Sequence, residues 1–250
     1  MTRIELTQWA AWAPGIVTRE DWEAWARAPQ PLVGGGAPEV SFMPALHRRR
    51  CDALSRAVLA VAHECCPEPL LSSVASVFAT RHGPFSTTVA LLEDLATGSP
   101  LSPARFTHSV HNAPSGLFSI WAKNPWPSST VAGGAETFAC GFLEAVTMLH
   151  REAGRPVLLV VADEVVPDPF QALAERLDST YAVALLLGDG QGEGSGSLGF
   201  RLDRTQATAT SSAWPDALEF LRWWLSGERK LCLARGPRAW VWSRDDRGND

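Results

Sequence analysis

The segment from Ser128 to Asp163 constrains the fold more than any other part of this chain. A short strand pattern, Ser129 to Ala132, leads through a glycine turn into a helical pattern over Thr137 to His150. The continuous apolar run Pro156 to Ala162 follows. An apolar run without alternation is typical of a strand buried on both faces. The segment therefore predicts a strand, a tight turn, a buried helix and a second, parallel strand.

Strand and helix patterns also alternate over the remainder of the chain, with turn residues between them. Helical periodicity favours helices, whereas short apolar or β-branched runs favour strands. This alternation predicts an α/β fold, a mixed sheet with helices on both faces. The further strands are expected at residues 3–13, 74–80, 181–187, 200–204, 231–234 and 239–242, the further helices at 18–27, 44–66, 86–97, 102–106 and 215–225, and glycine-rich loops at 28–38 and 188–199.

Composition limits the class of protein. A chain of 250 residues can bury a sizeable core, as one large domain or two small ones. A net charge of −5 gives no electrostatic reason to expect nucleic acid as a partner. No apolar run approaches the ~20 residues that span a bilayer, and the N-terminus lacks the apolar region of a signal peptide. We therefore expect a cytoplasmic protein that binds neither membranes nor nucleic acid.

Cysteine and glycine patterns argue against several common kinds of site. The five cysteines are scattered without the spacing of metal ligands, so we expect neither a metal nor a disulfide framework, and no cofactor. Gly194-x-Gly196-x-x-Gly199 has the glycine spacing of a dinucleotide site. A strand pattern follows it where such a site needs a helix, which favours a plain loop. The chain has no G-x-S-x-G motif, which disfavours an ordinary α/β-hydrolase.

Three kinds of side chain near the glycine turn could carry chemistry. Glu136 lies at the start of the helix, where backbone N–H groups and the helix dipole favour negative charge. It is either a helix-start acid alone or a carboxylate at the mouth of an acyl site. Cys140 is either a nucleophile or a packing residue, and its place inside the helix, away from the N-terminal field, favours packing. His108 and His111 are either structural groups or general bases.

An ordered set of short motifs carries a resemblance to a known family. From about Ile4 to Arg204 the chain resembles the N-terminal half of β-ketoacyl synthases, which have the thiolase fold. It is similar in particular to the truncated ketosynthase-like chain-length factors of aryl polyene and related bacterial pigment pathways. The motifs are Ala10-x-x-Ala13-Pro14-Gly15, Arg48-Arg49-Arg50, Ser102-Pro103-x-x-Phe106-Thr107, Ser109-Val110-His111-Asn112-Ala113, Gly133-Gly134-Ala135-Glu136-Thr137-Phe138-Ala139, Leu143-Glu144-Ala145 and Pro156-Val157-Leu158-Leu159.

The resemblance implies a truncated thiolase-like fold, a single half, as one domain over residues 1–250. Its core would cover about 4–204, with a C-terminal helix and hairpin at 215–243. Alignment places the family's nucleophilic cysteine on Glu136, and chain-length factors also lack that cysteine. Several carry an amide there, so a carboxylate departs from the pattern. The family's paired catalytic histidines lie in a C-terminal half, whereas no histidine of this chain follows His150. The resemblance therefore implies no catalytic residue.

The resemblance also implies a partner. A catalytic ketosynthase would pair with the segment from Phe106 to Ala132 across an interface of more than about 2,000 Å². This chain would shape the pocket for an acyl chain brought by an acyl carrier protein, in polyene, polyketide or fatty-acid-type elongation. The pocket and interface candidates are His108, His111, Asn112, Val131, Gly133, Gly134, Thr137 and Phe138.

Two other interpretations stay open. The chain could act alone, as an acyltransferase that uses Cys140 or a malonyl decarboxylase that uses Glu136. It could also be a structural homodimer without an acyl pocket. For Glu136 itself, we expect a carboxylate held by the backbone N–H groups that begin the 137–150 helix.

Overall fold

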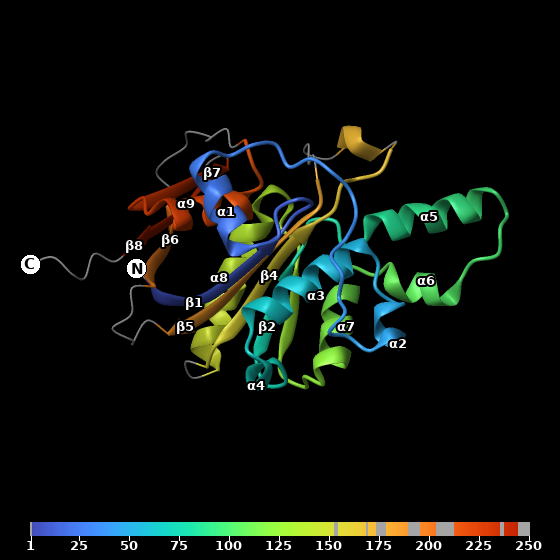
Figure 1. Cartoon of the computed structure of the whole chain (residues 1–250), viewed down its shortest axis with the longest axis horizontal. Helices are drawn as coiled ribbons and strands as arrows, with labels where there is room; N and C mark the ends of the chain where they lie inside the picture. Colours follow the sequence, from blue (N-terminus) through green and yellow to red (C-terminus); the bar gives the residue numbers. More distant parts are fainter. Residues whose placement is uncertain are drawn as a thin grey trace, which may run out of the picture.

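A mixed β-sheet organises the chain (Figure 1). The computed structural model describes residues 2–152, 155–168, 170–173, 179–189, 196–203, 213–235 and 238–244. The strands of these residues are β1 (Thr2–Trp12), β2 (Ala75–Ala79), β3 (Ser128–Val131), β4 (Val157–Asp163), β5 (Tyr181–Asp189), β6 (Ser197–Asp203), β7 (Lys230–Arg235) and β8 (Arg238–Arg244). They form one eight-stranded sheet in the order β3-β2-β4-β5-β1-β6-β8-β7.

The sheet combines a parallel part with an antiparallel part. β2 pairs in parallel with β3 on one side and with β4 on the other. The pairs β4–β5, β5–β1, β1–β6, β6–β8 and β8–β7 are antiparallel. The predicted α/β class with a mixed sheet is therefore confirmed. The carboxyl ends of the three parallel strands lie at one edge of the sheet, which is where ligands commonly bind in such folds.

Helices cover both faces of this sheet. Their bounds are α1 (Arg19–Arg27), α2 (Ala45–Arg48), α3 (Ala53–Cys65), α4 (Glu68–Leu71), α5 (Phe85–Ala96), α6 (Pro103–His108), α7 (Ala113–Ala122), α8 (Thr137–Arg151) and α9 (Asp216–Ser226), with 3-10 turns at Gly134–Glu136 and Phe170–Leu173. The helices α3 and α7 pack on one face, and α1, α8 and α9 pack on the other. The pair α5 and α6 projects from the body of the molecule (Figure 1). No helix among the described residues is both long and apolar enough to cross a bilayer.

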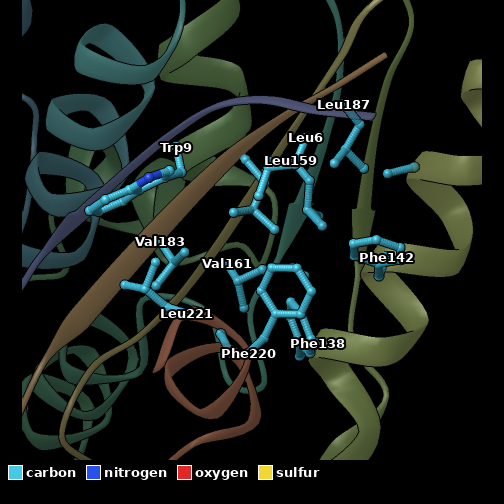
Figure 2. Close-up of a cluster of buried hydrophobic side chains, with 14 of the residues drawn as sticks. Leu6, Trp9, Phe138, Phe142, Leu159, Val161, Val183, Leu187, Phe220 and Leu221 are labelled. Atoms are coloured by element: carbon cyan, nitrogen blue, oxygen red, sulfur yellow. The ribbon is translucent and has the colours of Figure 1, made fainter. Parts of the chain in front are cut away.

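Strand β4 shows why the sheet needs two helical layers. Val157, Leu159 and Val161 point into the core under α8 and α9, which Figure 2 shows in close-up. Leu158 and Val160 alternate with them and point into the core under α3 and α7. Because both faces are apolar and fully buried, the predicted internal strand is confirmed.

The C-terminal part of the chain closes the core over α8. The ring of Phe138 lies 5.2 Å from that of Phe220 on α9 and 5.4 Å from that of Trp242 on β8. Phe142, one turn further along α8, contacts the same two rings at 5.7 and 5.6 Å. The expected C-terminal helix and hairpin are present as α9, β7 and β8. They belong to the main hydrophobic core, which therefore extends beyond the expected range of about 4–204. Residues 190–195, part of the loop predicted at 188–199, and residue 204, the end of the strand predicted at 200–204, lie outside the described residues.

Two local predictions were wrong. The single helix expected over residues 44–66 is divided into α2 and α3, with a turn between them. Asp52 causes the break, because its side chain accepts a hydrogen bond from the Ser55 N–H at 2.7 Å and starts a new helix there. Helix α7 was missed altogether, since its sequence has only a weak amphipathic pattern between the polar stretch at 109–112 and the left-handed Lys123.

Candidate functional site at the turn between β3 and α8

The turn after β3 depends on two glycines. Gly134 has φ +58°, a left-handed conformation that favours glycine. A Cβ on Gly133 would lie 2.8 Å from the Cys140 Sγ atom, so only glycine fits there without movement. The Thr137 hydroxyl accepts from the Gly133 N–H at 3.0 Å and donates to the Gly134 carbonyl at 2.7 Å. Three of the predicted site residues therefore build this turn together.

The Glu136 carboxylate is bound by strand β8. Its Oε1 accepts from the indole Nε1 of Trp240 at 3.2 Å, and its Oε2 lies 3.0 Å from an Arg238 guanidinium nitrogen. Trp240 is buried, and the Glu136 side chain is only 13% exposed. No side-chain capping bond forms at the start of α8. The expectation that backbone N–H groups hold this carboxylate was wrong.

The reason lies in the local backbone and in the length of the side chain. The first N–H groups of the turn already have partners, namely the Thr137 hydroxyl and the Gly133 carbonyl. Caps at this position usually use short side chains, whereas glutamate reaches further. The longer side chain extends to β8 and links two parts of the chain that lie 104 residues apart. With both oxygens engaged, Glu136 acts here as a structural acceptor.

Cys140 is half-buried beside the same turn, with its sulfur against Gly133. Burial raises the pKa of the Cys140 thiol, the nearby Glu136 carboxylate raises it further, and Arg238 opposes the two. Since the thiolate is the nucleophilic form, this environment disfavours reactivity at neutral pH. The arrangement agrees with the interpretation of Cys140 as a packing residue.

The remaining predicted residues do not converge on Glu136. Phe138 is buried in the core against Phe220, so its side chain is not accessible to a ligand at the turn. His111 contacts the Thr80 carbonyl through Nε2 at 2.9 Å, and Asn112 precedes α7, where its carbonyl accepts from Ser115. His108 ends α6 and is half-buried. Within the described residues, no hydrogen bond joins either histidine to Glu136 or Cys140, and no cluster of potential metal ligands forms.

A second buried polar cluster lies at the end of β4, and the sequence analysis missed it. Asp163 Oδ1 accepts from the Arg81 N–H at 2.6 Å and from the Thr80 hydroxyl at 3.1 Å. Its Oδ2 accepts from the Tyr181 hydroxyl at 3.2 Å. The adjacent Glu164 accepts from the Ser86 N–H at 2.6 Å. The only sequence signal was a pair of acids directly after a buried strand. This cluster fixes the loop between β2 and α5.

We expect a measurable coupling between Glu136 and the hairpin. Glu136→Ala should lower the free energy of unfolding by about 1–2 kcal/mol, because a charge-assisted hydrogen bond and an ion pair are lost. In a double-mutant cycle with Arg238→Ala, the coupling should be about 0.5–1 kcal/mol, since Arg238 is half exposed. Denaturant unfolding measures both values. Glu144→Ala, on the same helix, is the control, and strictly additive effects would contradict the pair.

The Cys140 thiol should respond to the charge of Glu136. Glu136→Gln removes the negative charge that raises the thiol pKa, so alkylation at pH 8 should become faster. Arg238→Gln should make it slower, because it removes the opposing positive charge. Mass spectrometry of the Cys140 peptide after iodoacetamide pulses measures these rates. Equal rates in the two variants would show that the three groups do not interact.

The Asp163 carboxyl should make stability depend on pH. Burial raises its pKa from 3.8 to about 6, against the three hydrogen bonds that lower it. Between these values the folded state binds more protons than the unfolded state, so the free energy of unfolding falls as pH rises from about 4 to 6. The slope is at most about 1.4 kcal/mol per pH unit.

Asp163→Asn should flatten this slope, since an amide does not titrate and Tyr181 can accept as well as donate. Urea unfolding at several pH values measures the effect, with the exposed Asp189→Asn as control. The expectation fails if Asp163→Asn keeps the slope of the wild type.

Comparisons with known proteins identify the family. The family model described as β-ketoacyl synthase, N-terminal domain, matches residues 22–243. A search of curated proteins found no match. Among solved structures, a chain of "Ketosynthase (ApeO) in Complex with its Chain Length Factor (ApeC)" from Xenorhabdus doucetiae is 30% identical, with a TM-score of 0.82 and coverage of 98% of this chain and 100% of that one.

Two more distant structures share the fold. A chain of "The ishigamide ketosynthase/chain length factor" is 13% identical, with a TM-score of 0.69 and coverage of 96% of this chain and 98% of that one. A β-ketoacyl synthase from Burkholderia phymatum STM815 is 16% identical, with a TM-score of 0.60 and coverage of 84% and 67%. Since the family model spans most of the sequence, the chain belongs to the β-ketoacyl synthase N-terminal domain family.

Proposed function

We propose that this chain is a non-catalytic chain-length factor that pairs with a catalytic ketosynthase. The observation that carries the proposal is the turn after β3, where alignment with the family puts the nucleophile. That position holds Glu136, and the chain's own hairpin engages its carboxylate through Arg238 and Trp240. A carboxylate with two donors already bound is poorly suited to attack a thioester or to take up a proton. The chemistry would then reside in a partner.

The surface around β3 supports a protein partner. Among the described strands, β3 pairs only with β2, so its outer edge presents unpaired backbone groups. Seven of the eleven exposed large hydrophobic side chains found in the described residues lie between Leu92 and Leu143. Phe106, Val110 and Ile120 belong to the segment expected to form the interface, and they are 66%, 45% and 58% exposed. An exposed apolar group of this kind favours a protein–protein contact.

The projecting pair α5 and α6 extends this surface (Figure 1). Leu92 and Leu95 on α5 are 49% and 63% exposed, and Leu101 between the helices is 48% exposed. In the proposed complex this arm would lie along the catalytic subunit and help to enclose the acyl chain. The acyl chain would arrive on an acyl carrier protein, and its length would be limited by side chains of both subunits. Similarity to a chain of a ketosynthase and chain-length factor complex supports this pairing.

The stand-alone alternatives fit the turn less well. An acyltransferase that uses Cys140 would need an accessible thiolate, whereas burial and Glu136 both raise the pKa of this thiol. A decarboxylase that uses Glu136 would first have to release Arg238 and Trp240. A homodimer could use the same β3 edge, so the assembly experiment below includes that outcome.

Charge placed on the proposed surface should separate the subunits. We expect Ile120→Arg to abolish co-elution with a co-expressed catalytic ketosynthase, because an unpaired charge in an apolar interface costs about 3–5 kcal/mol. Val131, the other candidate position, packs against the main core, so Val131→Arg would also disturb the fold. Ile120 is 58% exposed, so Ile120→Arg leaves the fold of the isolated chain unperturbed. Size-exclusion chromatography and the products of the assembled complex provide the measurements.

Leu202→Arg is the matched control, since Leu202 is an exposed strand residue on β6, far from β3 in the sheet order. Full co-elution of Ile120→Arg would place the interface elsewhere. If the chain instead forms an Ile120-dependent dimer without the ketosynthase, the homodimer is correct. In the assembled complex, Cys140→Ala should keep elongation within about tenfold, whereas loss of a nucleophile costs orders of magnitude more.

A further inference from the structure

A cavity on the α3 side of the molecule lies apart from the turn after β3. Its volume is about 580 Å³, within the range of pockets that hold small molecules. Three segments line it: the end of β1 with the turn that follows, the loop from Gly35 to Phe42, and the last two turns of α3. Figure 1 shows the chain between α1 and α2 passing beside α3 on its way across the molecule.

The walls of this cavity are aromatic and held in place. Trp12 is buried at the end of β1 and turns one side of its ring to the cavity. Phe42 stacks on the His63 ring with 3.9 Å between centroids, and both rings contact Trp121. Val61 is fully buried beneath them. An apolar floor and fixed rings suit a ligand with an apolar body.

Three solvent-exposed glycines lie on the rim of the cavity. A Cβ atom added at Gly15, Gly35 or Gly36 would meet no heavy atom within 4 Å. Gly15 and Gly36 have positive φ and would be strained by any side chain, but Gly35 does not. A large side chain on the rim at Gly35 would therefore cause neither a clash at its Cβ atom nor backbone strain.

The charge on the lining is negative. Its ionisable side chains are Glu39, Glu64 and His63, and no lysine or arginine lines the cavity. Burial lowers the pKa of His63, so its ring is neutral at pH 7, although Glu68 opposes this shift. The C-terminal turn of α3 adds the partial negative charge of the helix dipole. Arg19, the cation that acts on Glu64, is already stacked on Trp9 at 4.2 Å and bonded to its carbonyl.

Two polar side chains of the lining differ in exposure: the Glu64 side chain is exposed, whereas the His63 Nδ1 atom is buried. Burial raises the pKa of Glu64, so a cation placed beside it would favour its charged form. The His63 Nδ1 atom is buried and has no hydrogen-bond partner in the part of the chain that the structure describes. Aromatic faces next to carboxylates form the combination that recognises organic cations.

We propose that this cavity binds an organic cation with an apolar body, an alkylammonium or guanidinium group, seated against Trp12 and Phe42 between Glu39 and Glu64. None of the residues that line the cavity belongs to the proposed ketosynthase surface, although Trp121 behind the aromatic wall lies on α7 within the segment Phe106–Ala132. Binding of a cation can therefore be tested on the isolated chain, independently of the proposed pairing. The cation can be a free amine or the side chain of a basic peptide, and the two share the same recognition chemistry.

Calorimetry and ligand-observed NMR on the full chain test the proposal with a series matched in shape. Phenethylammonium should bind with a Kd of about 1 mM or tighter, and neutral 2-phenylethanol and anionic phenylacetate should bind more weakly. Glu39→Gln combined with Glu64→Gln should weaken binding of the cation at least roughly tenfold. Gly35→Trp, which places a large side chain on the rim, should weaken it by obstructing the cavity. Glu23→Gln, an exposed acid outside the cavity, is the control.

The proposal is overturned if phenethylammonium does not bind the folded wild type, if phenylacetate binds equally well, or if the double glutamine variant binds like the wild type. The glutamine variants retain side-chain size, so the test holds even where Gly35→Trp does not fold. A blocked arginine peptide distinguishes the two sources. Tighter binding of the peptide than of phenethylammonium identifies a protein segment as the ligand, and the reverse order identifies a free amine.

Discussion

Burial of both faces of β4 and β5 is the constraint on which the remainder of this structure depends. Their side chains alternate between two apolar cores, and neither strand offers a polar face to water. A sheet of this kind is stable only when helices cover it on both sides. The positions of α3 and α8 follow from this requirement, and α8 in turn fixes the turn that joins it to β3.

The aromatic side chains of α8 must also be buried. Phe138 and Phe142 would be exposed if the chain stopped after the central strands, and α9 and β8 bury them with Phe220 and Trp242. Once β8 lies there, Arg238 and Trp240 come within reach of Glu136. The carboxylate at the turn is thus engaged as a consequence of how the core is closed. A carboxylate engaged in this way agrees with the proposed role, in which a partner subunit performs the chemistry.

The two proposed binding surfaces have different physical origins. The surface around β3 is apolar because a sheet edge and a projecting helix pair leave hydrophobic side chains uncovered. The cavity beside α3 has aromatic walls, and it is negative because two glutamates and the C-terminal end of a helix line it. The first favours a folded protein with a complementary apolar surface, and the second favours a small or flexible cation.

Local signals in the sequence predicted much of the fold. The apolar run of β4 needs no context to indicate an internal strand, and a capping box formed by Thr18 and Asp21 begins the helix expected at 18–27. These local signals failed where a short stretch of sequence is compatible with two different local structures. Asp52 could continue a long helix or begin a new one, and its hydrogen bond to Ser55 decides for the second.

By itself, the sequence determined the α/β class, the order of most elements and the absence of any histidine after His150. Only the tertiary structure decided the partners of Glu136 and the cluster around Asp163. Arg238 and Trp240 lie about a hundred residues from Glu136, and Thr80 and Arg81 lie 83 and 82 residues from Asp163. Periodicity and capping act within a few turns of chain, whereas such contacts arise when the sheet sets distant strands side by side. The chemistry available at the turn is therefore a property of the packed core.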